Sequence, residues 1–161
     1  MQTNKLEIQK REQLTEIESI LVKNYGVRLS LRDFLVLKSE REEKIWLASK
    51  DIDKLDLRNL PVNSVGMNFG KLKRNDKINL TIEGAQLIGK SATKNVATID
   101  NAEKFLSGSD VEPSKLINCD LNNFVIVKSS GEVLGCGILR ENTIENLLPI
   151  SRRIQFNRSK P

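Results

Sequence analysis

The chain has 161 residues, 39% of them hydrophobic, which is enough apolar material for one medium domain or two small ones. It carries 26 Lys and Arg against 21 Asp and Glu, and the net charge of +5 favours an anionic partner. The absence of histidine removes the commonest metal ligand and general base, which excludes serine triads, cysteine–histidine pairs and mixed-ligand zinc sites.

The first predicted element is an amphipathic helix over residues 6–24 that ends at Gly26. Its apolar positions recur at helical spacing, at Leu14, Ile17, Ile20 and Leu21. Residues 27–38 first alternate and then become continuously apolar, which predicts one strand or two with a bend near Asp33. Residues 44–48 are expected to pair with them as a strand across a charged turn.

A short helix with a serine cap is predicted over residues 49–55, and Pro61 closes that connection. A strand over 62–72 follows, with glycines on one face that indicate a close approach of neighbouring backbone. The β pattern continues over 78–82, and residues 81–89 then become helical.

The second half begins with a predicted strand at 95–99 and a short helix capped by Asp100. Beyond this helix the pattern is β throughout. A continuous apolar strand at 124–128, a hairpin turn at 129–131 and a return strand at 133–139 follow one another.

The alternation of Gly135 and Gly137 with Cys136 is typical of a small, tightly curved barrel. Residues 144–148 are expected to cover this barrel, and residues 150–156 to supply its last strand. The two faces of that strand would differ, with Ile154 and Phe156 on one and Arg153 and Gln155 on the other.

Most of the net charge lies in two short segments. The first holds Lys71, Lys73, Arg74 and Lys77 against the single acid Asp76. The second follows Glu145, after which no acid occurs, and holds Arg152, Arg153, Arg158 and Lys160. A solvated face is the simplest explanation of either segment, whereas an acid-free basic strand suits phosphate contact, because neutralised phosphates release counterions.

The second half contains the run Ala102–Val111 in one-letter code AEKFLSGSDV, followed by FVIV at 124–127 and GEVLGCG at 131–137. These segments resemble a PUA domain, a small pseudo-barrel that binds RNA. In the first half, SVGMNFGKL at 64–72 followed by INLTI at 78–82 resembles the Nip-seven family of large-subunit ribosome-biogenesis proteins. The resemblance spans most of the chain after Tyr25.

The resemblance implies an α+β protein, in which an N-terminal α/β domain with an antiparallel sheet (residues 1–92) packs against a C-terminal PUA pseudo-barrel (residues 93–161). It also implies binding of U-rich or AU-rich precursor ribosomal RNA and of other assembly factors, without catalysis. Its RNA contacts would fall on Arg152, Arg153, Gln155, Arg158 and Lys160. The loop after Gly108 departs from this picture, because it carries Asp110 and Glu112.

The run from Lys71 to Lys77 is then a secondary basic patch, which either extends the RNA-binding surface of the C-terminal residues or contacts RNA elsewhere. We expect no catalytic residue, no cofactor and no metal. Two other interpretations stay open: an RNA-modifying enzyme using Asp, Glu or Lys, and a protein-interaction adaptor that serves an RNA-processing enzyme.

No stretch stays apolar long enough to cross a bilayer, and the polar start at residues 1–5 lacks the core of a secretory signal. We therefore expect a cytoplasmic protein, nucleolar if eukaryotic, and the composition suits a thermophilic archaeon. Cys119 and Cys136 are expected to be reduced, and Tyr25 and Trp46 to pack in the core rather than stack on bases.

Overall fold

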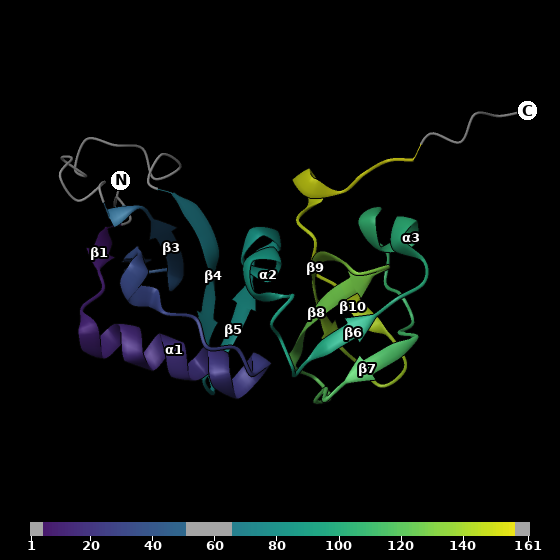
Figure 1. Ribbon diagram of the computed structural model, residues 1–161. Helices are drawn as coiled ribbons and strands as arrows, with labels where there is room; N and C mark the ends of the chain where they lie inside the picture. Colours follow the sequence, from purple (N-terminus) through teal and green to yellow (C-terminus); the bar gives the residue numbers. More distant parts are fainter. Residues whose placement is uncertain (1–4, 51–65, 157–161) are drawn as a thin grey trace, which may run out of the picture.

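A computed structural model describes residues 5–50 and 66–156 of the chain and contains two five-stranded sheets (Figure 1). The first sheet has the order β1-β2-β3-β4-β5 and is antiparallel throughout. The second has the order β10-β9-β8-β6-β7 and is mixed, because β6 runs parallel to β8. The predicted α+β class is confirmed.

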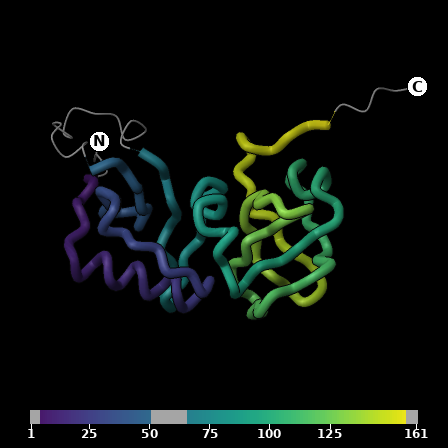
Figure 2. Tube along the Cα trace, in the orientation of Figure 1, coloured from purple at the N-terminus to yellow at the C-terminus, as the bar shows by residue number. Residues whose placement is uncertain are grey.

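The first half is built from β1 (Leu6–Ile8), α1 (Arg11–Tyr25), the 3-10 turn η1 (Leu31–Asp33), β2 (Leu35–Ser39), β3 (Lys44–Ala48), β4 (Met67–Lys73), β5 (Lys77–Leu80) and α2 (Ile82–Ile88). The second half is built from β6 (Val96–Thr98), α3 (Ala102–Leu106), β7 (Lys115–Ile117), β8 (Phe124–Ser129), β9 (Glu132–Leu139), β10 (Ile144–Asn146) and the 3-10 turn η5 (Ile150–Arg152). Figure 2 follows the same path as a trace, in which the yellow segment at residues 153–156, called the tail below, runs along the second half.

The first helix is shorter than predicted, because its first residues belong to the sheet. Leu6–Ile8 pairs antiparallel with β2, and the helix begins at Arg11. The Gln13 side chain accepts a hydrogen bond from the Lys10 amide at 2.8 Å, which fixes the helix start there. Its predicted end at Gly26 is confirmed, with a φ of +67° at that glycine.

The α1 helix covers one face of the first sheet with a core of fully buried side chains. Among them are Leu21, Tyr25, Ile45, Phe69 and Ile78. The predicted bend near Asp33 is the turn η1, and the predicted strand at 44–48 does pair with β2. Trp46 packs, partly buried, on a smaller cluster with Leu35 and Leu37. Most of the helix expected at 49–55, together with Pro61, lies outside the described residues.

The strand predicted over 62–72 corresponds to β4 in the described part, and it turns tightly into β5. The predicted helix at 81–89 is confirmed as α2, whose cap is the Thr81 hydroxyl, accepting from the Gly84 amide at 2.9 Å. Because that cap starts the helix, Ile82 is helical and does not extend the strand as expected.

In the second half, the cap of α3 is Asn101 and not Asp100. The Asn101 side chain accepts from the Lys104 amide at 3.0 Å. The predicted hairpin is confirmed: Ser130 and Gly131 have φ values of +50° and +80°, which matches the turn that tight antiparallel hairpins prefer. Within the described residues, β7 and β10 share no ladder, and the sheet is therefore not closed by backbone pairing.

The prediction of a last strand over residues 150–156 is wrong. Residues 150–152 form η5, and residues 153–156 belong to neither sheet. One cause is that the free edge of β10 is already bridged, because Ile144 of β10 pairs with Val111. The tail instead touches the end of α3, where the Ile154 amide donates to the Leu106 carbonyl at 2.8 Å. Ile154 and Phe156, expected to share one face of that strand, are exposed.

The two halves share a core and are joined by hydrogen bonds, one of which is buried. The main hydrophobic cluster of the first half includes Ile126, Val133 and Cys136 of the second. The Asn95 side chain donates to the Asn24 carbonyl at 2.6 Å and is 1% exposed. In Figure 1, α2 lies between the two sheets, and it packs on both β4 and β9.

Candidate nucleic-acid interface

The first basic segment forms the β4–β5 hairpin. Lys73 and Lys77 are register partners, and Lys73 and Arg74 are exposed. Asp76, the single acid in this segment, pairs with Lys23 of α1 at 3.7 Å. The described structure shows no ion pair for Lys71, Lys73, Arg74 or Lys77. This hairpin is therefore a positively charged edge of the first sheet.

The second basic segment does have an acid opposite it, contrary to expectation. Arg152 Nη1 lies 2.6 Å from Glu83 Oε1, which comes from the first turn of α2. The two side chains are 47% and 40% exposed, and the pair therefore lies at the surface rather than in the interior. Counting charges along the chain misses this pair because 69 positions separate its members.

The remaining tail residues lie apart from this pair. Arg153 donates from Nε to the Leu148 carbonyl at 3.2 Å, and its side chain lies against Gly108 while the residue stays exposed. Gln155 is exposed. Arg158 and Lys160 lie outside the described residues.

A pocket of about 420 Å³ lies between the two halves. One wall comes from β4, β5 and the start of α2, and the other comes from residues 147–152. Lys71 lines the first wall and Arg152 the second, so the structure brings one member of each predicted basic segment to the same pocket. Lys73, Arg74, Lys77 and Arg153 do not line it.

Lys44 is a third cation of the pocket, and counting charges along the chain does not reveal it. It is the direct register partner of Lys71 across the β3–β4 ladder, and its Nζ lies 2.8 Å from Glu42. Like charges directly opposite each other destabilise an antiparallel pair. The strand pattern at 44–48 predicted the strand but could not reveal which residue of β4 lies opposite Lys44.

The inner end of the pocket is neutral. Cys136 lines it, and burial raises the pKa of the Cys136 thiol to about 12, so the thiol is protonated at neutral pH and is a poor nucleophile. The side-chain oxygen of Asn68 is buried without a hydrogen-bond partner, as is the indole nitrogen of its register partner Trp46. Within the described residues, no group of three or more Cys, Asp and Glu side chains could hold a metal ion.

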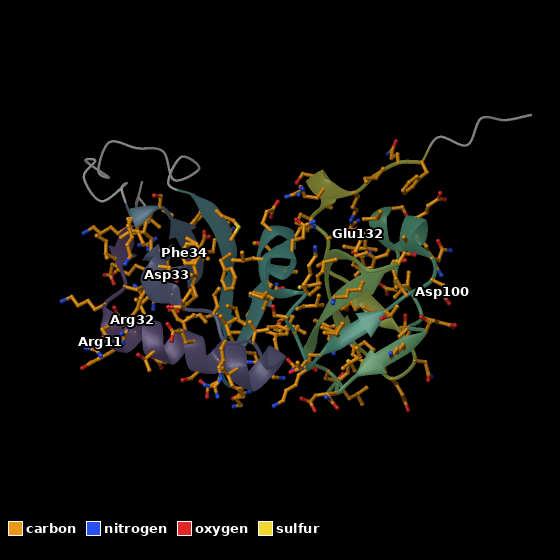
Figure 3. The ribbon with its side chains drawn as sticks, in the orientation of Figure 1. Arg11, Arg32, Asp33, Phe34, Asp100 and Glu132 are labelled. Atoms are coloured by element: carbon orange, nitrogen blue, oxygen red, sulfur yellow. The ribbon has the colours of Figure 1, made fainter. Side chains whose placement is uncertain are left out.

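A separate basic surface lies on α1 and η1. Figure 3 labels Arg11 and Arg32 there, at the end of the first half that faces away from the second sheet. A surface hollow of about 680 Å³ is lined by Lys23, Arg28 and Arg32, by the single described acid Glu18 and by the half-exposed Val22. Charge counting missed it because acids are interspersed along α1. Among the described residues, none from 150–156 lines it.

Comparison with protein-family models finds no match, and comparison with curated proteins finds none either. The class of this protein is therefore described from its fold and site alone. It is an α+β protein of two five-stranded sheets with a basic pocket between its halves. No helix in the described part of the chain combines the length and the apolar character needed to cross a membrane.

Proposed function

We propose that this protein binds RNA without transforming it and acts in large ribosomal subunit assembly and precursor ribosomal RNA processing. Its second half is, in this proposal, a PUA-type pseudo-barrel, its place of action the cytoplasm, and its preferred ligand U-rich or AU-rich RNA. The family assignment rests on the sequence resemblance of residues 64–82 and 102–137.

The observation that carries RNA binding is the convergence of Lys71 and Arg152 on one pocket. The β4–β5 hairpin continues the positive charge on one side of this pocket, and Arg153 continues it on the other. A basic surface that spans both halves suits a single strand of RNA, because each phosphate contact releases counterions. Arginine also offers a planar group that stacks on bases, in a chain that is only 4% aromatic.

The Arg152→Ala/Arg153→Ala double variant tests this function, measured by fluorescence anisotropy on U-rich, AU-rich and GC-rich 12-mers. We expect weaker binding to all three, and a salt slope that changes by roughly 0.7 for each phosphate that the variant no longer neutralises. Arg28→Ala/Arg32→Ala removes the same charge from the α1 side and is the matched control. Unchanged affinity in the Arg152/Arg153 variant would remove the tail from the interface.

The α1–η1 hollow supports a second candidate function, that of an adaptor which docks an assembly or processing protein. Val22 is 38% exposed beside Arg28 and Arg32, on a surface separate from the pocket. A pull-down after nuclease treatment distinguishes the two functions: partners that persist without RNA, and that Arg28→Ala/Arg32→Ala releases, bind the protein surface.

A further inference from the structure

The pocket between the halves holds more cationic than anionic groups at close range. Among the described residues, Lys44, Lys71 and Arg152 line it, against the single carboxylate of Glu83. Glu83 accepts from Arg152 at 2.6 Å and Glu42 pairs with Lys44 at 2.8 Å, whereas no described acid lies within ion-pair distance of Lys71. The ammonium group of Lys71 is therefore the one cation of this pocket without a charge partner in the described chain.

The position of Lys71 makes this excess unfavourable in the free protein. Its register partner is another lysine, Lys44, and residue 71 is only partly exposed, so solvent screens the repulsion incompletely. An anion bound between these two lysines and Arg152 would be attracted to all three, and this attraction would offset the repulsion between the lysines. Charge therefore argues for an anionic ligand at this end of the pocket.

The rest of the pocket fits the neutral part of a nucleotide. Leu80, Leu148 and Pro149 give it apolar walls, and Asn79, Thr81 and Ser151 add hydrogen-bonding groups. A pocket of about 420 Å³ lies within the size range of small-molecule sites, which combine mostly apolar walls with a few polar groups. A simple anion site would not need the apolar walls.

Building on the proposed RNA-binding function, we infer that this pocket receives a single nucleotide of the bound RNA strand. The phosphate lies between Lys71 and Arg152, and the base lies against Leu148 and Pro149. Glu83 holds Arg152 in the free protein. The phosphate then takes the place of the Glu83 carboxylate on the guanidinium, whose planar fork suits phosphate geometry.

Two variants of the full chain test this inference. Lys71→Gln removes a charge inside the pocket, and Lys73→Gln removes the same charge two residues further along β4, outside the pocket. We expect Lys71→Gln to weaken binding of a U12 oligonucleotide roughly tenfold, the value of one charge-assisted hydrogen bond, and Lys73→Gln to weaken it less. Circular dichroism melting curves establish that both variants are folded.

Uridine monophosphate tests binding to the pocket alone, without the contacts that a longer RNA makes elsewhere on the protein. In two-dimensional amide NMR spectra we expect it to shift the signals of Gly70, Thr81 and Ser151 in the wild type and in Lys73→Gln, but not in Lys71→Gln.

If U12 binds and the nucleotide does not move these signals, the pocket inference fails while the proposed function stands. The same holds if Lys71→Gln and Lys73→Gln lose U12 affinity equally. If inorganic phosphate binds as tightly as the nucleotide, the base contact is wrong. If the nucleotide binds and U12 does not, the site serves free nucleotides, and both proposals fail.

Discussion

The Arg152 guanidinium donates to the Glu83 carboxylate at 2.6 Å and so joins the segment after β10 to the first turn of α2. The two residues belong to different halves of the chain, and both side chains are partly exposed. Exposed ion pairs contribute about 0–1 kcal/mol to folding stability, which makes this contact easy to exchange for another anion.

Glu83→Gln should therefore increase RNA affinity severalfold while leaving the melting temperature nearly unchanged. Removal of the carboxylate frees Arg152 for phosphate and raises the positive charge of the pocket. Anisotropy with a U-rich 12-mer measures the effect, and Glu103→Gln, an exposed acid on α3, is the charge-matched control. A loss of affinity in Glu83→Gln would mean that Glu83 orients Arg152 rather than competing for it.

Gly108→Ala should destabilise the protein and displace the tail. Gly108 has a φ of +103°, and a Cβ there would lie 2.5 Å from Arg153 Cδ. We expect a loss of about 1–3 kcal/mol in the free energy of unfolding, from backbone strain and displacement of the Arg153 side chain. Gly131→Ala separates the two causes, because Gly131 also has a positive φ but nothing lies within 4 Å of its added Cβ. Equal losses in both variants would show that the Arg153 contact contributes nothing.

Asn95→Ala should be the most destabilising of these substitutions. The Asn95 side chain donates to the Asn24 carbonyl at 2.6 Å and accepts from the Asp120 amide at 2.9 Å, and the residue has a φ of +53°. Losing one buried and one partly buried hydrogen bond leaves the Asn24 carbonyl and the Asp120 amide without these partners, which costs roughly 2–4 kcal/mol. Urea denaturation measures this cost. Asn122→Ala is the control, since Asn122 has a φ of +63° but is exposed. A comparable loss there would assign the effect to the backbone alone.

The two cysteines should differ in reactivity. Both are free; Cys119 is partly exposed and Cys136 is buried. Burial raises the pKa of each thiol, that of Cys136 to about 12. A maleimide reagent should label Cys119 first in the folded protein and Cys136 only on unfolding, as mass spectrometry would show. Simultaneous labelling would contradict the packing of Cys136 between the halves.

Stability should also fall at alkaline pH. The folded pKa of Cys136 is raised above its unfolded value near 9, so the stability it contributes is complete below pH 9 and is lost as pH rises toward 12. The slope is at most about 1.4 kcal/mol per pH unit for one thiol. Tyr25, whose pKa burial also raises, adds to the loss at higher pH. Cys136→Ala should flatten the profile between pH 9 and 10, and an unchanged profile there would contradict the assignment.

Several elements were predictable because their signals are local. The end of α1 needs only a glycine that adopts a positive φ after an apolar face, and the β8–β9 hairpin needs only Ser130 and Gly131 between two apolar runs. The α2 helix begins at a threonine three residues before the amide that it caps. The two basic segments were visible by counting charges.

Other features depend on partners that are distant in the chain. Leu6–Ile8 is a strand only because β2 offers an open edge, and residues 153–156 are not a strand because they pair with neither sheet. The candidate site is of this kind as well. Strand register sets Lys44 opposite Lys71, and the packing of the halves brings Glu83 to Arg152.

The amino-acid sequence by itself determined the α+β class, most of the helices and hairpins, and the excess of positive charge in two segments. Only the tertiary structure decided which of those charges meet, which acid opposes them, and that a pocket forms where they meet. The physical reason is range: caps, turns and helical periodicity act over a few residues, whereas electrostatic and packing partners are chosen by the contact of surfaces that the folded chain brings together.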